Sequence, residues 1–156
     1  FEATLKWVEA GIEAGVNATP TLPWQLPRDS SPPDPSDIEI LDQWVEWAVQ
    51  GEASGAATYV RDRILFDFAR FRPAEALKQV EKVADSSDRD VLLSGLIEFH
   101  LDFGLPINSP RIRDLGKQLS SPKLYQKLME FHERPIDDPF DNEPDPPHPI
   151  FDPDDR

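Results

Sequence analysis

The chain contains no cysteine and a single methionine, Met129, among its 156 residues. Without thiols, a disulfide framework, a thiolate metal site and a cysteine nucleophile are all excluded. Glycine is scarce, at seven residues, and no glycine-rich phosphate-binding fingerprint is present. No apolar run approaches the roughly 20 residues that span a bilayer. These absences remove the usual signatures of redox, nucleotide-binding and membrane-spanning proteins.

Patterns typical of strands are also lacking, because Val, Ile and Thr are sparse and never alternate with polar residues over a useful length. Apolar residues recur instead at helical spacing. We therefore predict an all-α fold of about seven helices, arranged as an irregular bundle or a short helix-hairpin array. The predicted helices cover residues 2–15, 37–50, 56–71, a segment from Pro73, 88–103, and segments from Pro110 and Pro122. Helix 88–103 is apolar nearly all round and is expected at the centre.

A short phrase repeats along the chain. Ile97-Glu98-Phe99-His100 returns as Met129-Glu130-Phe131-His132, and Leu65-Phe66-Asp67-Phe68 resembles both. The phenylalanines Phe68, Phe99 and Phe131 follow one another after 31 and then 32 residues. Such a period is typical of stacked helical hairpins, which bury their apolar faces against neighbouring units. Tetratricopeptide, leucine-rich and ankyrin patterns are missing, so the repeat predicts an architecture and no particular family.

Proline and charge divide the chain. Segments 17–36 and 135–156 hold 13 of the 17 prolines. We predict one helical domain over 1–134, containing a proline-rich connector over 17–36, followed by an extended acidic tail over 135–156. This tail carries eight acidic residues and one basic residue. Its net charge is therefore half of the chain's net charge of −14. Its composition is that of a segment that does not fold in isolation.

The acidic balance limits the classes of partner. A chain this negative is repelled by phosphate backbones and anionic lipid surfaces, so direct nucleic-acid binding is not expected. It is attracted to basic surfaces instead. We therefore expect other protein subunits with basic surfaces as partners.

The candidate partner-binding residues lie in the two proline-rich segments. They are the connector's Trp24, the tail's apolar Phe140, Ile150 and Phe151, and the acidic Asp137, Asp138 and Asp141. The apolar residues of the connector have a second interpretation, in which they pack the loop onto the domain. The function expected is that of a non-catalytic helical interaction or scaffold subunit. The alternative is an acidic inhibitor or immunity-type protein that mimics nucleic acid.

No motif indicates catalysis, and we predict no catalytic residue, no cofactor and no metal site. His100 and His132 stand near acidic residues, but the histidine pair at i, i+4 typical of a zinc helix is absent. Both histidines fall in apolar helices, where a partly buried imidazole with a hydrogen-bond partner is the commoner outcome. Weak attraction of divalent cations by the acidic tail stays open as an alternative.

The compartment is not predicted. Because Met129 is the one methionine, Phe1 is not an initiator residue. The alternatives are a processed product, including one that has lost a targeting segment, and an excised domain.

Overall fold

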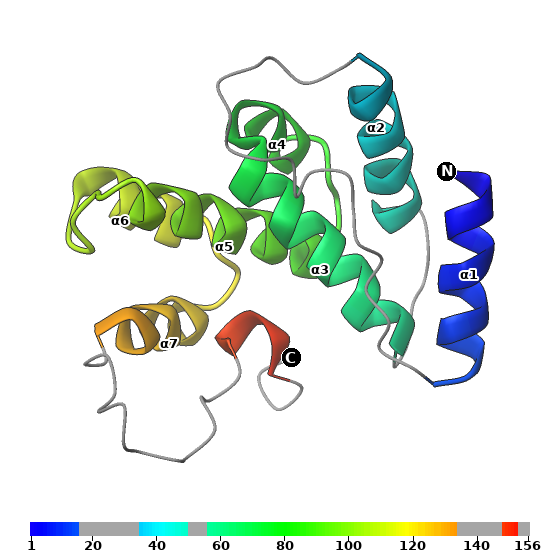
Figure 1. Cartoon of the computed structure of the whole chain (residues 1–156). Helices are drawn as coiled ribbons and strands as arrows, with labels where there is room; N and C mark the ends of the chain where they lie inside the picture. The colour runs from blue at the N-terminus through cyan, green and yellow to red at the C-terminus, as the bar shows by residue number, and fades with distance from the viewer. Residues whose placement is uncertain (16–34, 50–55, 134–147, 153–156) are drawn as a thin grey trace, which may run out of the picture.

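The computed structural model describes residues 1–15, 35–49, 56–133 and 148–152, and the secondary structure in these ranges is entirely helical (Figure 1). The helices are α1 (Glu2–Glu13), α2 (Pro35–Val49), α3 (Ala56–Phe71), α4 (Pro73–Val80), α5 (Ser86–Asp102), α6 (Pro110–Gly116), α7 (Pro122–Glu133) and the 3₁₀ turn η1 (Pro149–Phe151). None of the described helices has both the length and the apolar character needed to cross a membrane. The predicted all-α class is confirmed for this part of the chain.

The ends of several helices follow from local chemistry. Pro110 and Pro122 occupy first helical positions, where a missing N–H costs nothing. The Ser109 hydroxyl caps α6 by accepting a hydrogen bond from the Ile112 amide at 3.3 Å. Gly104 follows α5 with φ +82°, a left-handed conformation that favours glycine and stops the helix.

The start of α5 differs from the sequence expectation, which placed the first helical residue at position 88. The capping residue is Asp85, whose carboxylate accepts hydrogen bonds from the amides of Ser87 and Asp88 at 2.8 and 3.1 Å. An aspartate carboxylate satisfies two amides that would otherwise lack partners and also complements the helix dipole. The helix therefore begins two residues earlier than expected.

Replacing Asp85 with alanine is expected to lower the free energy of unfolding by about 1 kcal/mol, because those two amides lose their acceptor. Urea denaturation measures this loss. Ser87→Ala is the matched control, because it leaves the Asp85 cap in place. Equal losses in the two variants would contradict the assignment of Asp85 as the cap.

The core is built around α3 and α5, which form the most extensive pair among the described helices (Figure 1). Arg61 pairs with Asp88 near the starts of the two helices, and Arg70 pairs with Asp102 near their ends. These pairs are 27 and 32 residues apart in sequence, so α3 and α5 run in the same direction. α4 contacts both helices and returns the chain between them.

The close approach of α3 and α5 depends on Gly95. A Cβ atom built at this position would lie 2.8 Å from the Cβ of Ala69 and closer still to the backbone carbonyl oxygen of Phe66. Real Cβ atoms essentially never come within 3.0 Å of another heavy atom. Glycine at this position therefore allows the contact between α5 and α3. It does not serve the helix itself, because almost any other residue has a higher helix propensity.

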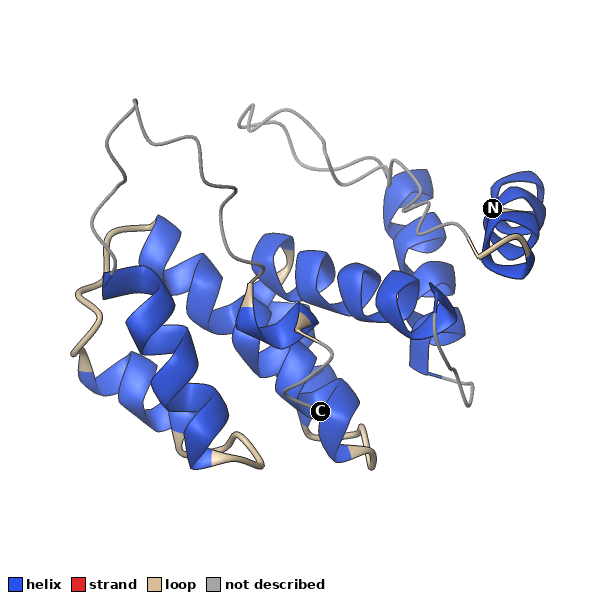
Figure 2. Ribbon diagram, turned by 90° about the horizontal axis from the view of Figure 1, so that it is seen from below, coloured by secondary structure: helices blue, strands red, loops and turns tan. Residues whose placement is uncertain are grey.

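The N-terminal helices cover one side of this pair. α1 lies beside α2 at the side of the molecule opposite α6 (Figures 1 and 2). The ring of Trp44 on α2 is 1% exposed and makes edge contacts with Phe1 and Trp47, at centroid distances of 5.0 and 5.7 Å. The Arg61 side chain donates a hydrogen bond to the carbonyl of Ala48, which joins the end of α2 to α3. Trp7 on α1 is 58% exposed.

Two aromatic residues lie further out than the apolar pattern predicted. Phe71 ends α3 and is 39% exposed, while Phe103 follows α5 and is 72% exposed. Sequence reasoning placed Phe71 at the end of the helix over 56–71 and Phe103 at the end of the central apolar helix over 88–103. Because α3 and α5 are parallel, both residues lie at the same end of the helix pair, beyond the Arg70–Asp102 ion pair where the core stops.

Candidate functional site: one carboxylate between two imidazoles

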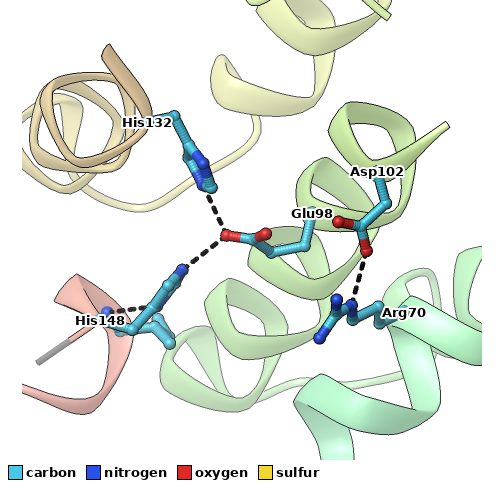
Figure 3. A network of polar contacts seen from close by, with 6 residues as sticks. Arg70, Glu98, Asp102, His132 and His148 are labelled. Carbon is cyan, nitrogen blue, oxygen red and sulfur yellow. Dashed lines mark hydrogen bonds and ion pairs between the residues drawn. The ribbon is translucent and has the colours of Figure 1, made fainter. Parts of the chain in front are cut away.

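Glu98, His132 and His148 meet beside the core, each from a different element (Figure 3). The Nε2 atom of His132 lies 2.6 Å from Oε1 of Glu98, and the Nε2 atom of His148 lies 2.7 Å from the same oxygen. One carboxylate oxygen is therefore shared by two imidazoles. This cluster joins α5, α7 and the C-terminal η1 turn.

Local sequence explains how each residue reaches the cluster. Glu98 follows the fully buried Leu96 and Ile97 on α5 and is itself 9% exposed. His132 occupies the last turn of α7. His148 lies between two prolines and is the N-cap residue of η1, so its backbone is restricted on both sides. Two of the three side chains are thus held by regular helices and the third by a rigid turn.

The capping role of His148 sets the position of its ring hydrogen. Its Nδ1 atom accepts a hydrogen bond from the Ile150 amide at 3.3 Å. A neutral imidazole whose Nδ1 accepts must carry its hydrogen on Nε2. That hydrogen then points at Glu98, so His148 donates to the shared oxygen in its neutral form.

The carboxyl of Glu98 is held in its ionised form. Burial raises its pKa, but the hydrogen bonds from His132 and His148 together with their charges outweigh this effect and lower the pKa to about 2. A buried carboxylate that accepts strong hydrogen bonds is a stable anion. The Glu98 carboxyl is therefore a carboxylate close to the core.

Phenylalanine rings surround the His148 imidazole. The centroids of Phe66, Phe131 and Phe151 lie 5.1, 5.0 and 5.8 Å from that of His148. The guanidinium of Arg63 lies 5.7 Å from the centre of the Phe151 ring. Limited water access strengthens the electrostatic interactions of the cluster.

These donor atoms form a set that can bind a cation. Two imidazole nitrogens and one carboxylate oxygen all lie within 4.8 Å of one another. Among the described residues this is the group of histidine and acidic side chains with the spacing of a metal site. The same combination of two histidines and one carboxylate holds catalytic zinc in several hydrolases and iron in oxygenases.

The two histidines of the repeated phrase are in different environments. His132 joins the cluster, whereas His100 accepts a hydrogen bond from Arg111 at 3.3 Å. Burial and the Arg111 charge lower the pKa of His100. Residues 98 and 100 are separated by about 200° around a helix, so Glu98 and His100 point in nearly opposite directions.

Two of the sequence-predicted partner-binding residues are described, and both contact the helical body. Ile150 is 4% exposed and belongs to the core, while Phe151 contacts the rings of Tyr59 and Phe66. Trp24, Phe140, Asp137, Asp138 and Asp141 lie outside the described residues. Sequence reasoning missed His148, although its position between Pro147 and Pro149 was a signal for a restrained side chain.

A separate cavity of about 250 Å³ lies between the starts of α5 and α7 and the η1 turn. Asp90 is its acidic residue, and it is engaged in a structural role. Its two carboxylate oxygens accept hydrogen bonds from the backbone amide and the hydroxyl of Ser120, the former at 2.9 Å. The cavity therefore lies where α5 is joined to the turn before α7.

The Glu98 cluster is thus the part of the described structure with the clearest chemical capacity. Comparison of the chain with protein-family models, curated proteins and solved structures finds no match.

Proposed function

We propose that this chain is a non-catalytic helical interaction subunit of a larger protein assembly, which docks a basic protein surface. The observation that carries the proposal is the 72% exposure of Phe103. Large aromatic side chains at interfaces supply most of the binding energy when they enter a partner's pocket. An exposed ring at the end of a rigid helix pair is suited to that role.

The surroundings of Phe103 support a fixed docking surface, which we name the aromatic end and define as Phe71, Phe99 and Phe103. The Phe99 and Phe103 rings lie 4.6 Å apart. The ion pair between Arg70 Nε and Asp102, at 2.7 Å, ties the two helices together beside it. A preorganised surface loses little entropy on binding.

Charge complementarity indicates the chemistry of the partner. The net charge of −14 steers the chain toward basic surfaces and away from phosphate. The acidic tail, proposed from the sequence as a second contact, would act in the same direction. We infer a partner with an apolar pocket bordered by lysine and arginine side chains.

The finer architecture that fits this role is a short helix-hairpin array. α3 contacts α4, α5 contacts α6, and α7 contacts η1, so each of three alternate helices is followed by a shorter element that packs on it. The repeated phenylalanines Phe68, Phe99 and Phe131 lie on α3, α5 and α7. Arrays of this kind commonly present extended binding surfaces.

Phe103→Ser is expected to weaken capture of the bound protein by more than tenfold, since hot-spot aromatics contribute about 2 kcal/mol or more. The measurement is affinity purification at low and high salt, with quantitative mass spectrometry of the wild type and the variant. Trp7→Ser is the matched control, because Trp7 is also exposed but lies on α1, at the other side of the molecule. Circular dichroism should show the same helix content in all three proteins.

The proposal is supported if one bound protein co-purifies with the wild type and with Trp7→Ser at low salt, but is lost with Phe103→Ser and is also lost at high salt. Equal retention by Phe103→Ser would contradict the proposal. If that retained protein processes nucleic acid and is released by salt alone, the alternative of an acidic nucleic-acid mimic would take its place.

A further inference from the structure

We propose that Glu98, His132 and His148 form a binding site for a divalent transition-metal ion of the zinc type, which fastens the C-terminal turn to the helical body. The site goes beyond the proposed docking function and does not depend on it. Its basis is the convergence of three ligand atoms from three separate elements on one point (Figure 3).

The donor set matches the chemistry of such ions. Imidazole nitrogen and carboxylate oxygen are preferred ligands of Zn²⁺, whereas Mg²⁺ and Ca²⁺ prefer oxygen ligands alone. The three side chains are 20%, 14% and 12% exposed for His132, His148 and Glu98. A cation would therefore be largely shielded and would neutralise the carboxylate.

The distances require a small adjustment. Ligands bound at 2.0–2.1 Å around a tetrahedral ion lie roughly 3.3 Å apart. The present Nε2–Oε1 distances are 2.6 and 2.7 Å, so each must lengthen by about 0.6–0.7 Å. In this structure two hydrogen bonds hold the ligand atoms together where the ion would stand between them. Rotation about the Glu98 side-chain bonds supplies the added length.

Binding also changes the ring hydrogens. Each Nε2 atom must offer its lone pair to the ion, so each neutral imidazole moves its hydrogen to Nδ1. In His148 the hydrogen on Nδ1 removes the acceptor of the Ile150 amide. The hydrogen bond that is lost is a long one, at 3.3 Å. The environment of the Ile150 amide should therefore change when a metal ion binds at this site.

The three ligands leave a fourth tetrahedral position for water or a group from a partner. Structural zinc sites generally use four protein ligands, whereas sites with three keep an open position. The structure places three ligands among the described residues.

The test is calorimetric titration of the full chain with Zn²⁺ in a large excess of Mg²⁺, which occupies the carboxylates of the acidic tail. Binding of one ion per chain is expected. His132→Gln and His148→Gln should each weaken it by more than tenfold, because even loss of an outer-sphere partner costs about 10–100-fold. His100→Gln is the matched control, since His100 pairs with Arg111 outside the cluster.

Nuclear magnetic resonance of the wild type gives a test without any substitution. Zn²⁺ should shift the Nε2 resonances of His132 and His148 and the amide resonance of Ile150, while those of His100 stay in place. Absence of one-to-one binding, equal weakening by His100→Gln, or unchanged imidazole resonances at saturating Zn²⁺ would each overturn the site.

Discussion

Gly95→Ala is expected to lower the free energy of unfolding by about 3 kcal/mol, although alanine is the better helix former by about 1 kcal/mol. The added methyl group would press against the Phe66 carbonyl oxygen, which belongs to the backbone of α3 and cannot rotate away. α3 and α5 must then separate along the most extensive interface between the described helices. A loss of this size lowers the midpoint of thermal unfolding by about 6–12 °C.

Two further variants make this prediction specific. Ala69→Gly combined with Gly95→Ala removes the contact with the Ala69 methyl group but leaves the carbonyl oxygen in place, so no rescue is expected. At Gly116 the three atoms nearest to an added Cβ all belong to the side-chain ring of Tyr125, which can move more easily than backbone, so Gly116→Ala should cost less. Recovery of wild-type stability in the double variant would show that the carbonyl contact is not the cause.

Glu98 should make the fold sensitive to acid. Its pKa is about 2 in the folded protein and close to the ordinary value of 4.5 when unfolded. A carboxyl whose pKa is lowered by folding stabilises the protein above the unfolded pKa, and this contribution is lost as the pH falls from about 5 to 2. A difference of about 2.5 pH units corresponds to about 3 kcal/mol. Glu98→Gln should lose that amount at pH 7 and little at pH 2.

Asp67 is the natural control, because it takes the place of Glu98 in the repeated phrase on α3. Burial raises the pKa of Asp67 more than the neighbouring Arg63 lowers it, and one of its carboxylate oxygens is buried without a hydrogen bond. Its ionised form therefore opposes folding at neutral pH. Asp67→Asn should leave stability at pH 7 unchanged or raise it. Denaturant unfolding of both variants across pH 2–7 measures the contrast, and parallel curves for the two variants would contradict it.

Much of the helical framework could be predicted from the sequence. The spacing of apolar residues and the proline and glycine signals around Pro110, Pro122 and Gly104 act over a few residues, and they placed the helices of the described chain closely. The central position of α5 followed from its apolar composition on all sides. The start of α5 was predicted less closely, because several neighbouring polar residues can act as the N-cap and the structure uses Asp85.

The candidate site could not be predicted in the same way. Glu98 and His148 are 50 residues apart, and no local pattern states that they meet. The repeated phrase drew attention to His100, yet the rotation of the helix separates its side chain from Glu98. The parallel course of α3 and α5 is likewise a tertiary feature. Phe71 and Phe103, at the ends of these two helices, are exposed, although both are apolar residues at the ends of predicted helices.

The order in which the ribosome makes the chain has a consequence for Glu98. Translation at 5–20 residues per second takes about 3–10 s to proceed from this residue to His148. During that interval α5 can already pack on α3, while its carboxylate lacks the second imidazole. The Glu98 carboxylate must therefore stay hydrated until His148 has been synthesised, so the cluster is completed later than the α3–α5 interface beside it.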